Sequence, residues 1–296
     1  MHTLVIGLGS MGFGAAVSCV RQGIKTTGFD LNPEALKRFE AEGGLAAPSL
    51  NTCHEIDCVL IFVVNASQAQ SVLFDSSLFD ALNPEALVIN CVTLAPSTAV
   101  DIANRVETQG FRYIDAPVSG GAAKALQGRM SIMASGSRHA MMNAKPVFDA
   151  IAEHVFELGD TAGHGSQMKL INQLLAGVHI AAAAEAMNLA ASLDMDLHKV
   201  IDVISQCAGS SWMFENRAPH IADGDYRPLS SVNIFVKDLG IVTEEASHQQ
   251  VVTPLSDAAL ALYREASDAG LGGEDDSAVV KVLAKQSNVT LPGSSQ

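Results

Sequence analysis

The sequence has few cations. It carries 18 lysine and arginine residues against 32 aspartate and glutamate residues, which gives the 296-residue chain a net charge of -14. Nucleic acids and anionic membranes attract proteins through clustered cations, so this balance argues against both as partners. A small anionic ligand would have to be held locally, by backbone N–H groups, a helix N-terminus or a few lysines.

Paired cysteines are also missing. The chain has five cysteines, an odd number, and they lie mostly within apolar runs without a CxxC pair. This pattern favours small core residues in a reducing compartment over a disulfide framework. Neither the cysteines nor the nine histidines show the spacing of metal ligands, so we expect no metal. The cysteines are Cys19, Cys53, Cys58, Cys91 and Cys207.

The sequence shows no segment typical of export or membrane insertion. No basic stretch precedes the apolar residues after Met1, and no uncharged span reaches the roughly 18 residues that a membrane helix needs. We therefore expect a cytoplasmic protein without a membrane partner. Internal repeats and low-complexity tracts are absent as well, and the length fits one large domain or two ordinary ones.

In the first half of the chain, short strand-type runs alternate with helix-type stretches. This alternation predicts an α/β fold with a doubly wound, Rossmann-type parallel sheet. Several runs are apolar at every position, which is typical of central strands that helices cover on both faces. The predicted strands are residues 2–6, 26–30, 58–64, 87–90, 111–115 and 130–134.

The second half is predicted to be all-α. Strand signals stop after residue 160, and an uninterrupted helix is expected at about 166–192. We predict an NAD-binding domain at 1–162 and an all-α domain for substrate binding and oligomerisation at 163–296, joined by that helix. Residues 287–296 resemble a frayed tail. Further helices are expected at 196–207, 211–217, 234–249, 255–269 and 276–286.

A glycine loop follows the first predicted strand and opens a helix, which is the context that the GxGxxG pattern requires. The first glycine allows a tight turn, the second lets the backbone approach a pyrophosphate, and the third lets helix and strand pack closely. The pyrophosphate would lie at the helix N-terminus. The expected cofactor contacts are Gly7, Leu8, Gly9, Ser10, Met11 and Gly12.

Asp30 ends the second predicted strand, where a carboxylate can accept hydrogen bonds from an adenosine ribose. Its charge would repel the 2'-phosphate of NADP, and Asp30 therefore predicts NAD as the cofactor. The alternative is that Asp30 caps a helix that starts at Pro33.

Loops after later strands are expected to reach the nicotinamide half of the cofactor. The candidates are Val64 and Asn65 in one loop and Thr93 in another. Thr93 could instead be a turn or helix-start residue, because Pro96 follows shortly.

A shaped loop at residues 115–122 follows another strand, where doubly wound folds bind ligands. Ser119 offers a hydroxyl, and the N–H groups of Gly120 and Gly121 could hold a substrate carboxylate. Pure turn chemistry explains these residues equally well.

Lys169 stands alone near the start of the long apolar helix. A desolvated amine can exchange protons near neutral pH, which suits a general acid or base. Asn172 and Gln173 follow on the same side and could orient the amine or a substrate hydroxyl. The alternative is a surface lysine whose stem covers apolar surface.

Other polar and aromatic residues are explained more simply. His179 is expected in the core or at an interface, and Trp212 and Phe214 belong to the core more readily than to a substrate cleft. The acidic run at 274–276 is typical of a solvated helix start.

Three motifs in order, the glycine loop, the DAPVSGG segment and the GxGxxxK start of the long helix, resemble the 3-hydroxyisobutyrate (β-hydroxyacid) dehydrogenase family. The resemblance spans nearly the whole chain. It implies a Rossmann domain joined through a long helix to an all-α domain. It also implies oxidation of hydroxy acids with a nicotinamide cofactor, and a homo-oligomer, either a dimer or a tetramer.

The resemblance also implies residue roles. Lys169 matches the catalytic lysine, and the loop from Ser119 to Gly121 matches the one that binds the substrate carboxylate. Thr93 matches a nicotinamide-side contact, and Lys237 matches a further ligand-side lysine, which we assign to the cofactor.

One position departs from the family pattern. Many members have Lys-x-x-x-Asn, whereas Gln173 occupies the last place here and Asn172 lies one position earlier. Which of the two amides orients the substrate is therefore left open.

Within the family, the segments at 9–16, 174–187 and 211–217 most resemble a branch that acts on a four-carbon sugar acid. This resemblance implies NAD-dependent oxidation of the C2 hydroxyl of L-threonate. A tartronate semialdehyde or 3-hydroxyisobutyrate-type enzyme would keep the same residues. Lys169 and Asp30 argue against an imine reductase, and Lys169 also argues against a non-catalytic NAD-binding module. A 6-phosphogluconate enzyme would need more cations and a Lys-x-x-His-Asn pattern, which the chain lacks.

Overall fold

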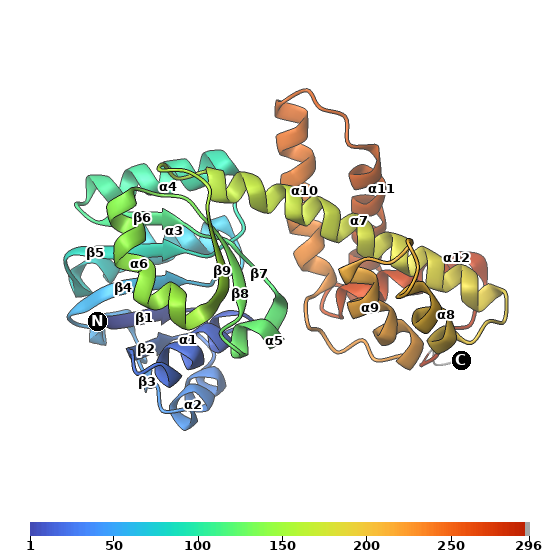
Figure 1. Cartoon of the computed structure of the whole chain (residues 1–296), viewed down its shortest axis with the longest axis horizontal. Helices are drawn as coiled ribbons and strands as arrows, with labels where there is room; N and C mark the ends of the chain where they lie inside the picture. The colour runs from blue at the N-terminus through green and yellow to red at the C-terminus, as the bar shows by residue number, and fades with distance from the viewer. Residues whose placement is uncertain (294–296) are drawn as a thin grey trace. The chain divides into compact units, whose positions relative to one another are not determined.

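The computed structural model describes residues 1–293, and contacts divide the chain into two compact units, Met1–Lys169 and Leu170–Gln296. The division falls inside helix α7 (His164–Ser192). The predicted division at 162/163 lies earlier than this one because the first turn of α7 packs against the first unit (Figure 1).

The first unit is built on a six-stranded parallel sheet in the order β3-β2-β1-β4-β5-β6. The predicted doubly wound fold is confirmed. The strands are β1 (His2–Ile6), β2 (Lys25–Phe29), β3 (Leu45–Ala46), β4 (Ile56–Ile61), β5 (Leu82–Asn90) and β6 (Arg112–Asp115). The predicted strand at 58–64 runs too far, because the chain leaves the sheet after Ile61 and exposes Val64.

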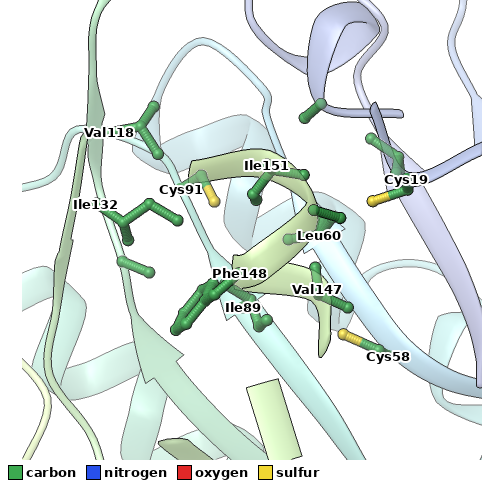
Figure 2. Close-up of a cluster of buried hydrophobic side chains, with 14 of the residues drawn as sticks. Cys19, Cys58, Leu60, Ile89, Cys91, Val118, Ile132, Val147, Phe148 and Ile151 are labelled. Carbon is green, nitrogen blue, oxygen red and sulfur yellow. The ribbon is translucent and has the colours of Figure 1, made fainter. Parts of the chain in front are cut away.

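Helices cover both faces of this sheet. Successive residues of one strand, such as Val59 and Leu60, belong to different buried clusters, as the alternation of a strand requires. In Figure 2, Val147, Phe148 and Ile151 lie among the side chains of one such cluster. The helices are α1 (Gly12–Arg21), α2 (Pro33–Ala41), η1 (Leu50–Thr52), α3 (Ala66–Phe74), η2 (Leu78–Ala81), α4 (Pro96–Thr108), α5 (Gly121–Leu126) and α6 (Arg138–Ile151).

The first unit also contains a second sheet of three strands in the order β7-β8-β9. It consists of β7 (Val118–Ser119), β8 (Met130–Ala134) and β9 (Ala152–Glu157). The strand at 130–134 was predicted. The sequence did not indicate β3 and β7, which have two residues each, or β9, whose exposed residues lack an apolar pattern.

The second unit consists of helices, as predicted. Its core gathers buried residues of α7 and of the helices after it. These helices are α8 (Leu197–Ile204), α9 (Trp212–Asp223), α10 (Val232–His248), α11 (Pro254–Ala266), η3 (Ser267–Leu271), η4 (Asp276–Val279) and α12 (Val280–Ser287). The expected frayed tail is wrong at Leu291, which is buried in this core, and residues 294–296 lie outside the described part.

Helix α7 is long and apolar enough, by length and composition alone, to cross a membrane. Of its most apolar window, 44% is already buried inside the structure. The core helix of a soluble protein passes the same test, so this feature is weak evidence for a membrane span.

Four of the five cysteines are buried and unpaired, as expected of small core residues. Burial raises the pKa of the Cys19 thiol to about 12 and that of Cys58 further. Cys207 departs from the prediction because it is exposed.

Candidate active site

The glycine loop between β1 and α1 has the geometry that its pattern predicts. Gly7 has a φ of +90°, and a Cβ there would lie 2.7 Å from the Phe62 carbonyl oxygen. A Cβ at Gly12 would overlap the Gly7 carbonyl oxygen. Both positions therefore require glycine, one for the turn and one for close packing of α1 on the sheet.

Gly9 differs from its two neighbours in the motif. It is exposed, and a Cβ at Gly9 would meet no atom within 4 Å. Packing of the protein itself thus does not require glycine here. The space beside the backbone at the N-terminus of α1 fits the close approach of a pyrophosphate, and N–H groups in the first turn of a helix favour such an anion.

Asp30 follows β2 and turns its carboxylate toward the glycine loop. Its Oδ2 accepts a hydrogen bond of 2.6 Å from the Leu8 N–H, and its Oδ1 accepts one of 2.7 Å from the Asn32 N–H. Asp30 is not the cap of α2, because Asn32 occupies the N-cap position and accepts from the Glu34 N–H. The capping alternative for Asp30 is therefore wrong.

Two further loops follow neighbouring strands β4 and β5. Asn65 caps α3 by accepting from the Gln68 N–H, and the adjacent Val64 is 53% exposed. Thr93 is half-buried and is not a helix cap, because Ala95 occupies the N-cap position of α4. The carboxyl ends of parallel strands share one edge of the sheet, so these loops and the glycine loop lie along one edge.

The loop after β6 leads through β7 to α5. Gly120 has a φ of +127° and Gly121 a φ of +71°, conformations that favour glycine whether or not a ligand binds. Ser119 is half-buried beside them. Turn geometry is therefore part of the reason for this sequence.

Lys169 is only 7% exposed, and its Nζ donates a hydrogen bond of 2.8 Å to the Val118 carbonyl oxygen. The surface-lysine alternative is wrong. The structure thus brings together the predicted catalytic lysine and the loop predicted to bind substrate, through the residue directly before Ser119.

The sequence pattern missed the role of Asp115, the last residue of β6. Its side chain is fully buried and accepts hydrogen bonds from the Gly163 N–H at 3.1 Å, the Ser166 N–H at 2.8 Å and the Ser166 hydroxyl at 2.8 Å. Burial raises the pKa of the Asp115 carboxyl, although these hydrogen bonds oppose the shift. The signal available in the sequence was an acidic residue at a strand end, followed much later by two glycines around a helix start.

In the second unit, the two candidate amides belong to a short polar chain. Gln173 donates from Nε2 to Asp238 at 2.5 Å, and its Oε1 accepts from the Asn172 Nδ2 at 2.8 Å. The Lys237 ammonium lies 2.6 Å from the other Asp238 carboxylate oxygen. Asp238, which is 2% exposed, therefore connects two of the predicted residues.

The acidic run at 274–276 is not a solvated helix start. Asp275 and Asp276 are fully buried, and Arg217 forms a bidentate pair with Asp276 at 2.5 and 3.1 Å. Burial raises the pKa of Asp276 to about 6, although Arg217 opposes the shift. Composition alone could not reveal that α9 carries the matching cation.

The remaining candidates have structural surroundings. His179 lines an apolar groove of about 560 Å³ between α7, α8 and α9, and Phe214 is buried in the core. Trp212 is 54% exposed, so the expected core position of Trp212 is wrong. Among residues 1–293, no cluster of three or more histidine, cysteine or acidic residues is arranged to hold a metal ion.

A parallel sheet with a glycine loop and a strand-end aspartate, followed by a helix with a buried lysine, defines a dinucleotide-dependent dehydrogenase. The family model described as the NAD binding domain of 6-phosphogluconate dehydrogenase matches residues 3–159. The model described as NAD-binding of NADP-dependent 3-hydroxyisobutyrate dehydrogenase matches residues 163–283. The chain belongs to the 3-hydroxyisobutyrate dehydrogenase family and is an NAD-dependent hydroxyacid dehydrogenase.

Known relatives cover nearly the full chain. L-threonate dehydrogenase of Haemophilus influenzae is 49% identical, with 97% of this chain and 96% of the relative aligned. The Escherichia coli protein of the same name is 46% identical over 99% and 97%. A crystal structure named 3-hydroxyisobutyrate dehydrogenase, from Salmonella typhimurium, has a TM-score of 0.91 and 49% identity, covering 95% of this chain and 99% of that one.

Proposed function

We propose that this chain oxidises the C2 hydroxyl of L-threonate to the 2-oxo acid, with Lys169 as the general base. The observation that carries the proposal is the buried Lys169 side chain, whose Nζ lies 2.8 Å from the Val118 carbonyl oxygen beside the substrate loop. The names of the relatives that are 46–49% identical support L-threonate as the substrate.

The cofactor is proposed to bind along the glycine loop. Bound NAD supplies the acceptor for the hydride that leaves C2 of the substrate. The open space at Gly9 supports a pyrophosphate beside the N-terminus of α1. Asp30 would accept from the adenosine ribose and repel a 2'-phosphate, while Val64, Asn65, Thr93 and Lys237 are the remaining proposed contacts. The first loop contributes Gly7, Leu8, Gly9, Ser10, Met11 and Gly12.

The substrate carboxylate is proposed to bind at Ser119, Gly120 and Gly121. The hydroxyl and the backbone N–H groups can hold an anion without adding net charge. This arrangement accommodates a carboxylate substrate in a chain with a net charge of -14.

Lys169 is proposed to take the proton of the C2 hydroxyl as the hydride departs. For this step the Lys169 amine must be neutral, because only a neutral amine has a lone pair that can accept the proton. In the reverse direction the ammonium would return the proton to the alkoxide. The protein therefore supplies proton transfer and orientation, which contribute most when the donor and acceptor atoms are held in contact.

Of the two amides, Asn172 is the better candidate to orient the substrate hydroxyl. A carboxylate only accepts hydrogen bonds, so Asp238 fixes the amide nitrogen of Gln173 and turns its oxygen toward Asn172. Gln173 thus serves mainly to hold the amide of Asn172. This division of roles would replace the single asparagine of the family pattern.

A 3-hydroxyisobutyrate-type reaction is the second candidate, because the Salmonella typhimurium structure with that name is 49% identical. It would use the same residues with a different substrate tail, as would reduction of tartronate semialdehyde. A non-catalytic NAD-binding module is less consistent with the buried Lys169. We also propose a cytoplasmic homo-oligomer, a dimer or a tetramer.

Initial rates of NADH formation over a panel of hydroxy acids test the substrate. The panel contains L-threonate, D-threonate, the erythronates, glycerate and 3-hydroxyisobutyrate. We expect L-threonate with NAD to give the highest kcat/KM. A higher value for 3-hydroxyisobutyrate, or no turnover of any four-carbon sugar acid, would contradict the proposed substrate.

A further inference from the structure

The start of helix α7 has no capping side chain of its own. Gly163 precedes the helix with a φ of +107° and has no side chain that could accept a hydrogen bond. The first N–H groups of a helix have no partner within the helix and must find acceptors elsewhere. For α7, buried residues far away in the sequence provide them.

Asp115 and Ser135 provide these acceptors from the ends of two strands. Asp115 Oδ2 accepts from the N–H groups of Gly163 and Ser166, and Ser135 Oγ accepts from the Gly165 N–H at 2.9 Å. Asp115 Oδ1 accepts from the Ser166 hydroxyl. A carboxylate is a stronger acceptor than a hydroxyl and is favoured by the positive end of the helix dipole.

The backbone reinforces this attachment. Asp115 and Ser135 exchange two backbone hydrogen bonds, of 3.0 and 2.8 Å. A Cβ at Gly165 would overlap the Met133 carbonyl oxygen and lie 2.7 Å from that of Asp115. The absence of a side chain at Gly165 thus lets the first turn of α7 lie directly against the strand ends.

Lys169 is fixed by the same segment of chain. It follows Ser166 by three residues, which places both on one face of α7, and both are buried. Its Nζ donates to Val118, which follows Asp115 by three residues. The segment from Asp115 to Val118 therefore contacts α7 twice. Asp115 binds the first turn of the helix, and the Val118 carbonyl oxygen accepts from the Lys169 Nζ.

From this geometry we propose that Asp115 is a positioning residue for the dehydrogenase reaction: it fixes the first turn of α7 and thereby sets the position of Lys169. The inference rests on the proposed role of Lys169 as general base. Asp115 itself takes no proton from the substrate. Since a shift of about 1 Å in a reacting group can lower a rate about a hundredfold, small losses at this attachment are expected to reduce turnover.

Two conservative variants test the proposal. Asp115→Asn keeps the size of the side chain but leaves one acceptor oxygen, and Ser166→Ala removes a single hydrogen bond. We expect kcat to fall about tenfold or more for Asp115→Asn and about threefold for Ser166→Ala. The matched control is Ser137→Ala, which removes the side-chain cap of α6 in the same unit.

The measurement is kcat per NADH-binding site, with the sites counted by fluorescence titration, using the hydroxy acid that the wild type oxidises fastest. We expect kcat per site to fall while the Kd for NADH and the KM for the acid stay within twofold, and the control to keep the wild-type kcat. An unchanged kcat in both variants would overturn the proposal. A lower number of sites with an unchanged kcat per site would also overturn it, because it would show a purely structural role.

The wild-type and Lys169→Ala enzymes separate this inference from the proposed function. If Lys169→Ala retains near-normal turnover, the proposed function fails, and the positioning role of Asp115 fails with it. If Lys169→Ala is inactive but the two variants match the wild type, the positioning role alone fails.

Discussion

Each unit of the chain buries carboxylates, but the two units compensate these charges differently. In the first unit, Asp115 is held by backbone N–H groups and hydroxyls. In the second, Asp276 is held by the guanidinium of Arg217, and Asp275 accepts from the Ser277 N–H and hydroxyl. The neutral donors attach the start of α7 to the end of β6, whereas the ion pair attaches α9 to η4.

The buried cluster around Asp115 is expected to serve catalysis, whereas the pair of Arg217 and Asp276 is expected to stabilise the fold. Asp115 and its hydrogen-bond donors fix the start of α7, the helix that contains Lys169. The pair of Arg217 and Asp276 joins α9 to η4 within the second unit. Substitutions of Asp115 and Lys169 should therefore change the rate, and substitutions of Arg217 should change stability.

The largest kinetic effect is expected for Lys169→Ala. Loss of a general base lowers turnover by about a hundredfold to ten-thousandfold, and we expect kcat to fall about a thousandfold. The Kd for NADH, measured by fluorescence titration, should stay near the wild-type value because the glycine loop is unchanged. Near-normal turnover would remove Lys169 from the mechanism.

The largest stability effect is expected for Arg217→Met, which leaves buried carboxylates without their cation. Removal of one partner of a buried pair costs about 3–5 kcal/mol, and urea denaturation should show a loss in that range. The kcat per folded molecule should be unchanged. Arg227→Met, at an exposed pair with Asp225, is the matched control and should leave the unfolding midpoint unaltered.

The loss of stability caused by Arg217→Met should depend on pH. In the wild type, burial raises the pKa of Asp276 from 3.8 to about 6, so its contribution to stability is present below the lower value and is lost as pH rises through the higher one. Without Arg217 the pKa should rise further. The destabilisation by Arg217→Met should therefore be larger at about pH 8 than at about pH 5, and equal losses at both would contradict ionised buried carboxylates as the cause.

A smaller effect on affinity is expected for Asp30→Asn. Hydrogen bonds to a charged group contribute about 1.5–3 kcal/mol, so NADH should bind at least about tenfold more weakly. Removal of the charge should also bring the Kd values for NADH and NADPH closer together. Fluorescence titration of the variant with each cofactor would measure this change. Asp101→Asn, on the exposed face of α4, should alter neither affinity.

The smallest effects are expected for alanine substitutions at two glycines of the loop between β1 and α1, and the two effects should differ in kind. A Cβ at Gly9 meets open space, so Gly9→Ala should weaken NADH binding severalfold with an unchanged unfolding midpoint. Gly12→Ala should instead destabilise the protein, because its Cβ would overlap the Gly7 carbonyl oxygen. Gly240→Ala, also in open space but in α10, is the control for an added methyl group. Equal losses of stability for Gly9→Ala and Gly12→Ala would contradict these roles.

Local patterns predicted most of the fold. The apolar runs indicated β1 and β8 with their observed bounds, because a buried strand needs an apolar residue at nearly every position. They could not indicate β9, whose residues are stabilised by pairing with β8 while their side chains stay exposed. Strand pairing depends on partners that are distant in the sequence.

The sequence indicated those candidate-site residues whose surroundings are set by residues close to them in the chain. Lys169 stood out as a lone cation in an apolar helix, and Gly7 and Gly12 have the roles that their spacing indicates. Asp115 did not stand out, because its donors lie about fifty residues away. The buried pair of Arg217 and Asp276 was missed for the same reason.

Lys169→Ala and Arg217→Met, each measured for both kcat and the free energy of unfolding, test the contrast between the two units most directly. We predict that Lys169→Ala lowers kcat about a thousandfold with folding intact and that Arg217→Met lowers stability with an unchanged kcat per folded molecule. If Arg217→Met lowered kcat as much as Lys169→Ala, the division between a chemical first unit and a structural cluster in the second would be contradicted.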